Sequence, residues 1–333
     1  MTTEGFDPDS FDPETAAEPG SGIFGLDCER DASAIVLLPV PLDATVSYGV
    51  GTAEGPAAIL RASHQVDLFD VQTGRPYARG IHMLEKPVDG EACAEASRLV
   101  RDGAERAGID SLCRRVHDAV ESTVDEILED GRIPGVVGGD HSVALGGIRA
   151  VARRYPGVGV LQVDAHADLR HGYEGFAYSH ASIMDNVLRE ADGLGRLVQV
   201  GIRDLSEAEM QRAAEDERVV LHHDLAWKKR LAQGESFLSL CEEAIGALPD
   251  LVHVSFDIDG LDPKLCPHTG TPVPGGLDFH EACLLLQAVV ESGRRIVGFD
   301  LTEVTPGPEG DEWDANVGAR VLYKLCGFAL LTG

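Results

Sequence analysis

Residues 133–164 read IPGVVGGDHSVALGGIRAVARRYPGVGVLQVD. Two short runs in this stretch, 133–139 and 158–164, consist largely of Val, Ile, Leu and Gly, as expected of strands that are buried on both faces. Residues 142–154, which lie between them, have the pattern of a helix. A strand, a helix and a second strand in this order predict a parallel βαβ unit.

The same alternation of apolar runs and helical patterns extends over most of the chain. Further strands are expected at 34–40, 197–202, 218–223, 251–257 and 295–301. Further helices are expected at 113–130, 206–215, 235–247, 279–292 and 315–328, with an additional helix within 88–112. Repeated alternation of this kind predicts an α/β fold, in which a mainly parallel sheet carries helices on both faces.

The first 24 residues differ from the rest of the chain. They are acidic, contain interspersed Pro, Gly and Ser, and show no apolar periodicity. Such a segment has too few apolar groups to join a core, so we expect residues 1–24 to form a mobile acidic N-terminal arm. Because no internal linker is evident, residues 25–333 are expected to form a single domain.

The charge of the chain is strongly negative. It has 56 Asp and Glu residues against 28 Lys and Arg residues, which gives a formal net charge of −28. A field of this sign repels phosphate backbones, so no nucleic-acid partner is expected.

Several features point to the cytoplasm. No apolar run reaches the roughly 20 residues that a membrane-spanning helix needs, so no membrane partner is expected. The N-terminus lacks the basic and apolar regions of a secretory signal. The seven cysteines are scattered and never spaced as C-x-x-C, a pattern that is typical of free thiols in a reducing compartment.

Three of the expected strands end in residues that commonly bind metals. The segments are GGDHS (138–142), DAHAD (164–168) and DID (257–259). Side chains at alternate positions of an extended segment point to one face, so each of the last two groups aims its polar side chains together. The candidate metal ligands are His141, Asp164, His166, Asp168, Asp257 and Asp259.

Each of these segments alone has a simpler interpretation. GGDHS is typical of a capped turn between a strand and a helix, and D-x-D is common at solvated strand ends. All three together, at the carboxyl ends of strands in one α/β pattern, favour a metal site, because crowded carboxylates repel one another unless a cation neutralises them. Carboxylates with one or two imidazoles suit manganese, with nickel, cobalt or iron as alternatives, and six ligands are enough for two ions.

These motifs carry a family resemblance. GGDHS (138–142), DAHADLR (164–170), SFDIDGLDP (255–263), TGTPVPGGL (269–277) and FDLTEVTP (299–306) resemble, in order and spacing, the motifs of the ureohydrolases, which include arginase and agmatinase. The resemblance covers roughly residues 33–330 and implies a three-layer αβα arginase-like fold that forms one catalytic domain. It also implies a homotrimer or homohexamer that hydrolyses a guanidino compound to urea and an amine.

The resemblance further implies a role for each candidate ligand. Two Mn²⁺ ions per chain are expected. The first is expected to bind His141, Asp164, Asp168 and Asp257. The second is expected to bind Asp164, His166, Asp257 and Asp259, so that Asp164 and Asp257 bridge the two ions.

Three further residues match functional positions of the family. Glu303 in DLTEVTP is expected to orient the cationic guanidinium group of the substrate. His180 in YSHAS is expected to shuttle the proton that the leaving amine requires, for which an imidazole has a suitable intrinsic pKa. Thr271 in TGTPV is expected to bind substrate near the metals, although by pattern alone Glu303 and Thr271 would be turn or cap residues.

The loop LRHGYEGFAYS (169–179) limits the choice of substrate but does not identify a single one. This loop resembles that of agmatinase-type prokaryotic members and lacks the asparagine-containing loop of arginases, so agmatine is favoured. Arg170, if it points inward, favours a carboxylate-bearing substrate instead; if it pairs with Glu174, the pocket is free to hold an amine. The alternatives are therefore arginase, guanidinobutyrase, guanidine hydrolase and formiminoglutamase activity.

A catalytically silent scaffold or regulatory relative is the alternative of another class, but retention of all six ligands, His180 and Glu303 argues against it. A nucleotide-binding protein is disfavoured because no GxGxxG or P-loop follows any strand. His222, His223 and Asp224 match no metal position of the family and are expected to end a strand. His253 is expected to have a supporting or core role. His171 is expected either to line the pocket or to face solvent.

Overall fold

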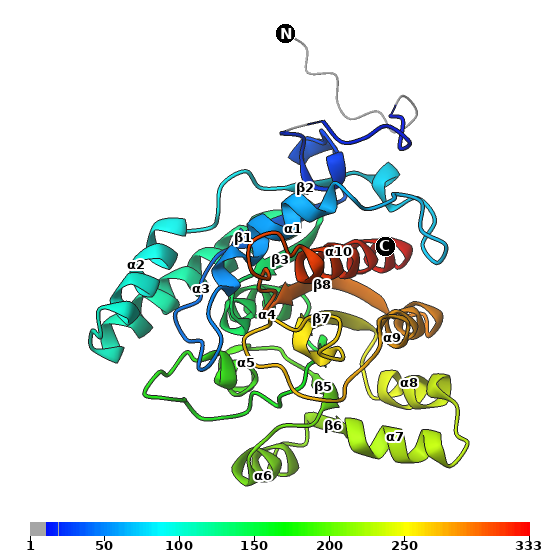
Figure 1. Cartoon of the computed structure of the whole chain (residues 1–333). Coiled ribbons are helices and arrows are strands. Elements are labelled where there is room, and N and C mark those ends of the chain that lie inside the picture. The colour runs from blue at the N-terminus through cyan, green and yellow to red at the C-terminus, as the bar shows by residue number, and fades with distance from the viewer. Residues whose placement is uncertain (1–10, 19) are drawn as a thin grey trace.

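The computed structural model describes residues 11–18 and 20–333, which contain one eight-stranded sheet in the order β2-β1-β3-β8-β7-β4-β5-β6 (Figure 1). The strands are β1 (Ile35–Val40), β2 (Ile81–Met83), β3 (Ile133–Gly138), β4 (Gly159–Val163), β5 (Arg196–Ile202), β6 (Val219–His223), β7 (Leu251–Asp257) and β8 (Arg295–Thr302). All neighbouring strands are parallel.

The order of the strands creates a reversal at the centre of the sheet. After β3 the chain does not add the adjacent strand but crosses to β4, and then builds outward through β5 and β6. It later returns to place β7 and β8 in the space between β3 and β4. The carboxyl ends of β3, β8, β7 and β4 are therefore side by side, and in open parallel sheets ligands bind at such a point of reversal.

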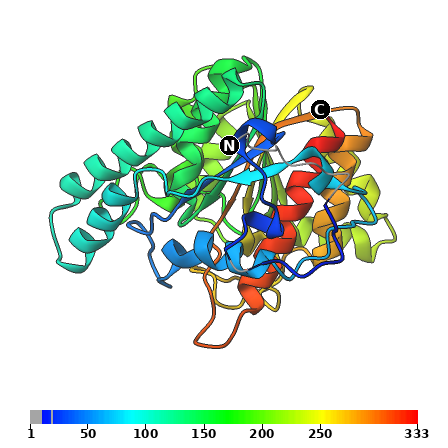
Figure 2. The same cartoon turned by 90° about the horizontal axis from the view of Figure 1, so that it is seen from above.

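Helices cover both faces of the sheet, so the molecule has three layers (Figure 2). One face carries α2 (Gly90–Arg101), α3 (Arg106–Glu129), α4 (Ala144–Arg154), α5 (Ile183–Glu190) and α6 (Glu207–Glu215). The other carries α1 (Gly55–Ser63), α7 (Asp224–Ala232), α8 (Phe237–Gly246), α9 (Phe279–Glu291) and α10 (Trp313–Leu331).

The core consists of two apolar layers, one on each side of the sheet. Successive side chains of β1 alternate between them: Ile35 and Leu37 pack on the α10 side, whereas Val36 and Leu38 pack on the α3 side. All four side chains are fully buried, which explains why the strand reads as a continuous apolar run. The expected three-layer α/β fold is confirmed.

All seven expected strands are present, and the differences concern short elements. The edge strand β2 has only three residues, and α1, α5 and α7 have eight or nine, which is too few for a clear helical period. The segment 88–112 contains α2 and also the first turns of α3, which begins at Arg106.

The last residues of the expected N-terminal arm are part of the core. Ile23 is fully buried and Phe24 is 3% exposed. The Phe24 backbone N–H donates to Ser63 Oγ at 2.8 Å, and its ring makes an edge contact with Tyr323, with centroids 4.8 Å apart. Residues 1–10 and 19, on which part of the arm prediction falls, lie outside the described residues.

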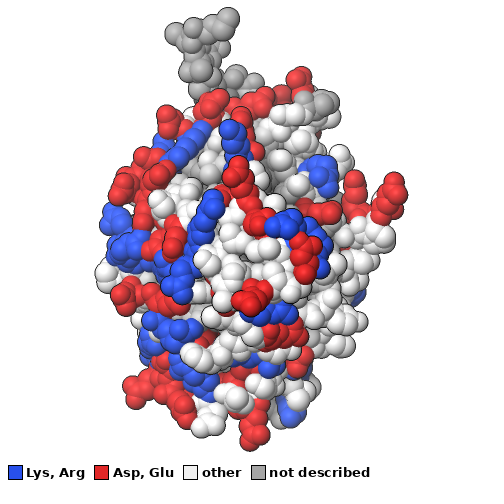
Figure 3. Space-filling model, turned by 90° about the vertical axis from the view of Figure 1, so that its left-hand side faces the viewer, with Lys and Arg blue, Asp and Glu red and all other residues white. Residues whose placement is uncertain are grey.

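Acidic and basic side chains are interspersed on the face that carries α2 and α3 (Figure 3). In the part of the chain that the structure describes, no helix is both long enough and apolar enough to cross a membrane. All seven cysteines are buried and free.

Candidate metal centre and active site

The candidate ligands lie where the four central strands end. His141 follows β3, Asp164 follows β4, Asp257 is the last residue of β7, and Glu303 follows β8. The turn after β3 is fixed by Asp140, whose Oδ1 accepts a hydrogen bond from the Ser142 backbone N–H at 3.1 Å. This cap turns the chain sharply and aims His141 across the strand ends.

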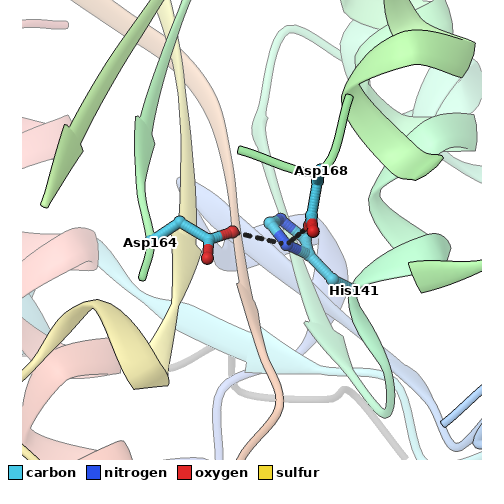
Figure 4. Close-up of side chains that lie close together, drawn as sticks. All are labelled: His141, Asp164 and Asp168. Carbon is cyan, nitrogen blue, oxygen red and sulfur yellow. Dashed lines mark ion pairs between the residues drawn. The ribbon is translucent and has the colours of Figure 1, made fainter. Parts of the chain in front are cut away.

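A first group of side chains surrounds the Nδ1 atom of His141 (Figure 4). Nδ1 lies 3.1 Å from Asp164 Oδ2 and 3.1 Å from Asp168 Oδ2. Asp257 Oδ2 is 3.4 Å away. One imidazole nitrogen and three carboxylate oxygens that converge from three segments form a set of ligands suited to a divalent cation.

A second group lies beside the first and shares Asp164 with it. His166 Nδ1 lies 3.0 Å from Asp259 Oδ2 and 3.6 Å from Asp164 Oδ1. The ligand-type atoms of Asp164, His166 and Asp259 approach one another closely enough to hold a second ion. Asp257, expected to bridge both ions, borders the first group through His141, and its Oδ1 accepts the backbone N–H of Asp259 at 2.8 Å.

The buried carboxylates perturb one another strongly. Burial raises the pKa of Asp257 well above its usual value, and the charges of Asp259 and Asp164 raise it further. Burial and the charge of Asp164 raise the pKa of Asp168 to about 7. For His166, burial lowers the pKa, but the carboxylates of Asp259 and Asp164 outweigh burial and raise it to about 12. A site that draws protons this strongly is suited to a metal cation.

The hydrogen bonds around His141 leave one nitrogen free to bind a metal. The Ser255 hydroxyl donates to Asp300 Oδ1 at 2.8 Å, so its oxygen accepts from the His141 Nε2–H, 2.9 Å away. The Nδ1 lone pair of a neutral ring then points at the carboxylates, and Nδ1 is buried without a hydrogen-bond partner among the described residues. Metal-binding histidines typically donate their other N–H in this way.

Two chains of hydrogen-bonded side chains support the ligands. The sequence predicted a supporting or core role for His253 but did not identify Asp300, Gln162 or Gln199. His253 Nε2 lies 2.8 Å from Asp300 Oδ2, which places the ring behind Asp300 and Ser255, in a supporting role. On the other side, Gln199 donates to Gln162 at 2.6 Å, and Gln162 donates to Asp164 Oδ2 at 2.7 Å. Buried polar residues within apolar strands were the available signal.

Glu303 and His180 are in direct contact. Glu303 Oε1 accepts the His141 backbone N–H at 2.8 Å and lies 3.2 Å from His180 Nδ1. Glu303 Oε2 is buried and has no hydrogen-bond partner among the residues that the structure describes. Burial lowers the pKa of His180, but the carboxylate of Glu303 and the charges of Asp140 and Asp168 outweigh burial and raise it to about 9.

These side chains border a cavity of about 170 Å³. Five predicted site residues line it: His166, Asp168, His180, Asp257 and Thr271. The Thr271 hydroxyl donates to Asp259 Oδ2 at 3.3 Å. The sequence did not identify Ser47, Tyr173, Asp204 and Glu209, which also line the cavity, because none of them belongs to a metal-type motif.

Arg170 also lines the cavity, but its partner differs from the expected one. Its guanidinium lies over the Tyr173 ring, 4.6 Å from the centroid, and its Nε is 3.5 Å from Glu209 Oε2. Glu174 is exposed and does not line the cavity. Glu209 therefore takes the position that the sequence interpretation gave to Glu174, because the start of α6 brings it next to the loop.

The residues that were set aside lie apart from both ligand groups. His223 ends β6 and Asp224 begins α7, while the His222 ring packs against Trp227. His171 is exposed and its Nδ1 lies 3.0 Å from Asp185 Oδ2. None of these four residues belongs to a group of candidate ligands within the described residues.

Comparison with known proteins agrees with this geometry. The profile of the Arginase family matches residues 33–327, nearly the whole chain. The chain belongs to the Arginase family. The ureohydrolase resemblance of its motifs is thereby confirmed, as is its expected class of enzyme, a hydrolase that splits a guanidino compound into urea and an amine.

Individual members of the family are similar over almost their full length. An N(1)-aminopropylagmatine ureohydrolase of Thermus thermophilus is 33% identical over 92% of this chain and 94% of its own. A guanidinobutyrase of Pseudomonas aeruginosa is 30% identical over 89% of this chain and 86% of its own. The crystal structure of the agmatine ureohydrolase of Thermoplasma volcanium, 25% identical, superposes with a TM-score of 0.72 over 97% of this chain and 96% of that one.

Proposed function

We propose that this member of the Arginase family binds two Mn²⁺ ions and hydrolyses a guanidino compound with an amine-bearing tail, such as agmatine. The observation that carries the proposal is the pair of ligand groups that share Asp164. The ligands of the first ion are His141, Asp164, Asp168 and Asp257. The ligands of the second are Asp164, His166, Asp257 and Asp259.

The metal proposal is tested by elemental analysis of protein reconstituted with Mn²⁺. The wild type should approach two ions per chain. Asp257→Ala removes an oxygen donor from the centre of the site, so we expect a lower metal content and loss of turnover, as is usual when a buried charge loses its partner. An unchanged metal content in this variant would contradict the ligand assignment.

The chemistry divides between the metals and the side chains. A bound divalent cation supplies hydroxide at neutral pH, because coordination lowers the pKa of water from 15.7 to about 7. Glu303 offers its unpaired, buried Oε2 to the substrate guanidinium, so that a charge-assisted hydrogen bond orients the group. His180, which contacts Glu303 and borders the cavity, donates the proton that the leaving amine needs.

The amine-bearing tail is supported by the state of Arg170. Its guanidinium already contacts the buried carboxylate of Glu209 and the Tyr173 ring, so its charge is partly neutralised. Asp204, 68% exposed in its side chain, lines the same cavity and offers a further negative charge. Two related enzymes named for agmatine derivatives or agmatine, from T. thermophilus and T. volcanium, agree with this charge pattern.

A second candidate is a substrate whose tail ends in a carboxylate. The observation that favours it is that Arg170 lines the cavity at all, with a side chain that is 37% exposed. Guanidinobutyrate, arginine and formiminoglutamate are substrates of this class, and guanidine has no tail. The guanidinobutyrase of P. aeruginosa shows that an enzyme of this class is among the relatives.

A substrate panel distinguishes these candidates. We expect the Mn²⁺-loaded protein to release urea with the highest kcat/KM from agmatine or N(1)-aminopropylagmatine, and with lower values from arginine, guanidinobutyrate and guanidine. Formiminoglutamate, measured by formamide release, completes the panel. A clear preference for any carboxylate-bearing substrate would overturn the amine proposal but leave the ureohydrolase class intact.

The homotrimer or homohexamer and the cytoplasmic location stay predictions. Light scattering coupled to gel filtration distinguishes a monomer of 35.5 kDa from three or six copies.

A further inference from the structure

We propose that Arg203 is a positioning residue of the second metal group, which consists of Asp164, His166 and Asp259. Arg203 lies in the loop between β5 and α6 and is half-buried. The inference rests on the proposed two-metal function, because it concerns how one of the two ligand groups is held. It assigns the residue no contact with the substrate or the ions.

The Arg203 guanidinium donates hydrogen bonds only to backbone carbonyls. Its terminal nitrogens lie 2.6 Å from Asp259 O, 3.1 Å from Leu261 O and 3.0 Å from Gly201 O. A longer contact of 3.4 Å reaches Gly260 O. The backbone carbonyls of three consecutive residues in the turn after β7 therefore face the Arg203 guanidinium. The first of these residues is the candidate ligand Asp259.

The same guanidinium also binds the loop that contains Thr271. Nε and a terminal nitrogen lie 3.2 Å and 3.0 Å from Val273 O. Thr271 in this loop donates to Asp259 Oδ2, so the carboxylate and the main chain of Asp259 are both held from the same side. Arg203 thus joins the loops after β5 and β7 with the segment 271–276.

The backbone of the Arg203 loop fixes the remaining two ligands. The N–H groups of Arg203 and Asp204 both donate to Ala165 O, at 2.8 Å and 3.0 Å. Ala165 stands between Asp164 and His166, and its own N–H donates to Asp259 Oδ1 at 3.0 Å. Three of the four ligands proposed for the second ion, Asp164, His166 and Asp259, are therefore within one residue of a backbone atom that hydrogen-bonds to this loop or to Arg203.

Close packing requires glycine at two positions of TGTPVPGGL (269–277), Gly275 and Gly276. A Cβ atom on Gly276 would lie 2.9 Å from Arg203 Cζ, and one on Gly275 would lie 3.2 Å from Arg203 Cδ. Both glycines have positive φ, 93° and 103°, which other residues rarely adopt. A Cβ on Gly276 would also lie 2.7 Å from Gly260 O and 2.8 Å from Leu261 O, so the absence of a side chain lets this segment lie against both the guanidinium and the turn after β7.

Lysine cannot replace arginine in this role. The guanidinium is a planar fork of five N–H groups, which reaches carbonyls in several directions at once, whereas lysine has one nitrogen with three donors. Arg203→Lys keeps the charge but must abandon some of the five carbonyl oxygens. The first group shares Asp164 with the second but has a support of its own, because Ser255 and Asp300 hold His141 from the other side of the site.

The test is the metal content and affinity of Arg203→Lys and Gly276→Ala. We expect both variants to retain one Mn²⁺ of near wild-type affinity and to bind the second about 10- to 100-fold more weakly, the usual effect of losing a group that orients a ligand. Isothermal titration measures the two affinities. Electron paramagnetic resonance distinguishes the spin-coupled signal of a Mn²⁺ pair from the six-line signal of a single ion.

Arg294→Lys is the matched control. Arg294 is also half-buried and also binds backbone carbonyls, those of Leu248 and Gly246, but beside the amino end of β8, opposite the site. It should bind two ions like the wild type. If one of the two variants at the site misfolds, the other still tests the inference. Circular dichroism of the metal-free proteins shows whether each variant is folded.

Three outcomes separate the inference from the proposal beneath it. Selective weakening of one ion in folded Arg203→Lys supports the positioning role, whereas weakening in Gly276→Ala alone reports only the packing of segment 271–276 on the turn after β7. Two ions bound with wild-type affinities, or equal weakening of both, overturns it. A wild type that binds no pair of ions contradicts the two-metal function itself.

Discussion

At the scale of single residues, the site contains two residues with unfavourable backbone conformations, and neighbouring hydrogen bonds hold the backbone in place. Asp168 and Glu303 have positive φ values of 53° and 63°, a region that residues other than glycine seldom occupy. Glu303 is held by the backbone N–H of His141. Strained backbone of this kind persists where the surrounding contacts determine it, often at functional sites.

The role of His180 separates proton transfer from metal binding. His180 borders the cavity and contacts Glu303, but it belongs to neither ligand group. His180→Ala should therefore retain the metal content of the wild type while kcat falls about 10²- to 10⁴-fold, the usual contribution of a general acid or base. Steady-state kinetics on protein of measured metal content checks this. Full activity of the variant would remove His180 from the reaction.

The charge of the substrate tail is also decided by single residues, and a substitution of Arg170 tests it. If the tail is an amine, Arg170→Ala should change kcat/KM for agmatine only modestly, because Arg170 contacts Glu209 and Tyr173 instead of the substrate. If the tail is a carboxylate, the loss should be about 1.5–3 kcal/mol, or roughly ten- to hundredfold, with arginine or guanidinobutyrate. Measuring all three substrates on both proteins distinguishes the two cases.

At the scale of elements, α3 contains a histidine that makes folding sensitive to acid. His117 is fully buried between α4 and the Tyr178 ring, whose centroid is 5.3 Å away. Neither ring nitrogen has a hydrogen-bond partner among the described residues. Burial, together with the charge of Arg149, lowers the pKa of His117 from 6.5 to about 3.

This shift predicts a pH dependence of stability. Below pH 6.5 the unfolded chain binds a proton at His117 that the folded chain does not. The free energy of unfolding therefore falls progressively as the pH drops from 6.5 toward about 3. His117→Phe should remove this component, which is at most about 1.4 kcal/mol per pH unit. Urea denaturation of both proteins at pH 7, 6 and 5 measures it. Parallel pH profiles would show that His117 does not contribute.

The elements also show which features were predictable from local pattern. β4 and β7 were located because most of their residues are apolar, as is typical of strands buried on both faces. Three-residue β2 and nine-residue α1 were not, because neither spans enough residues to establish a period. The burial of Ile23 and Phe24 was not predicted either, because the acidic segment before them shows no apolar periodicity.

At the scale of the whole molecule, folding and metal binding should be coupled. The ligands come from segments that are more than 100 residues apart, His141 and Asp259 for example, so the site exists only in the folded chain. A ligand that binds only the folded state stabilises it by about 2.7 kcal/mol when present at 100 times its Kd. Removal of the metals should therefore lower the Tm.

Calorimetry checks this coupling on one preparation. The chelated protein should melt below the same protein after Mn²⁺ is restored, and the Tm should rise with Mn²⁺ concentration. A Tm that does not respond to chelation or to added Mn²⁺ contradicts a structural contribution of the site. Asp257→Ala serves as the comparison, because its response to Mn²⁺ should be weaker.

Local pattern in the chain is enough to identify seven of the eight strands, the polar residues at their carboxyl ends and the family to which these motifs belong. The apolar runs and periods that mark strands and helices involve residues close together in the chain, so they are visible in the sequence. The placement of β7 and β8 between β3 and β4, which brings Asp257 and Glu303 next to His141, is decided by the tertiary structure. So are the contacts of Arg170 with Glu209 and of Arg203 with the turn after β7, because they join loops whose distance in space has no local signature.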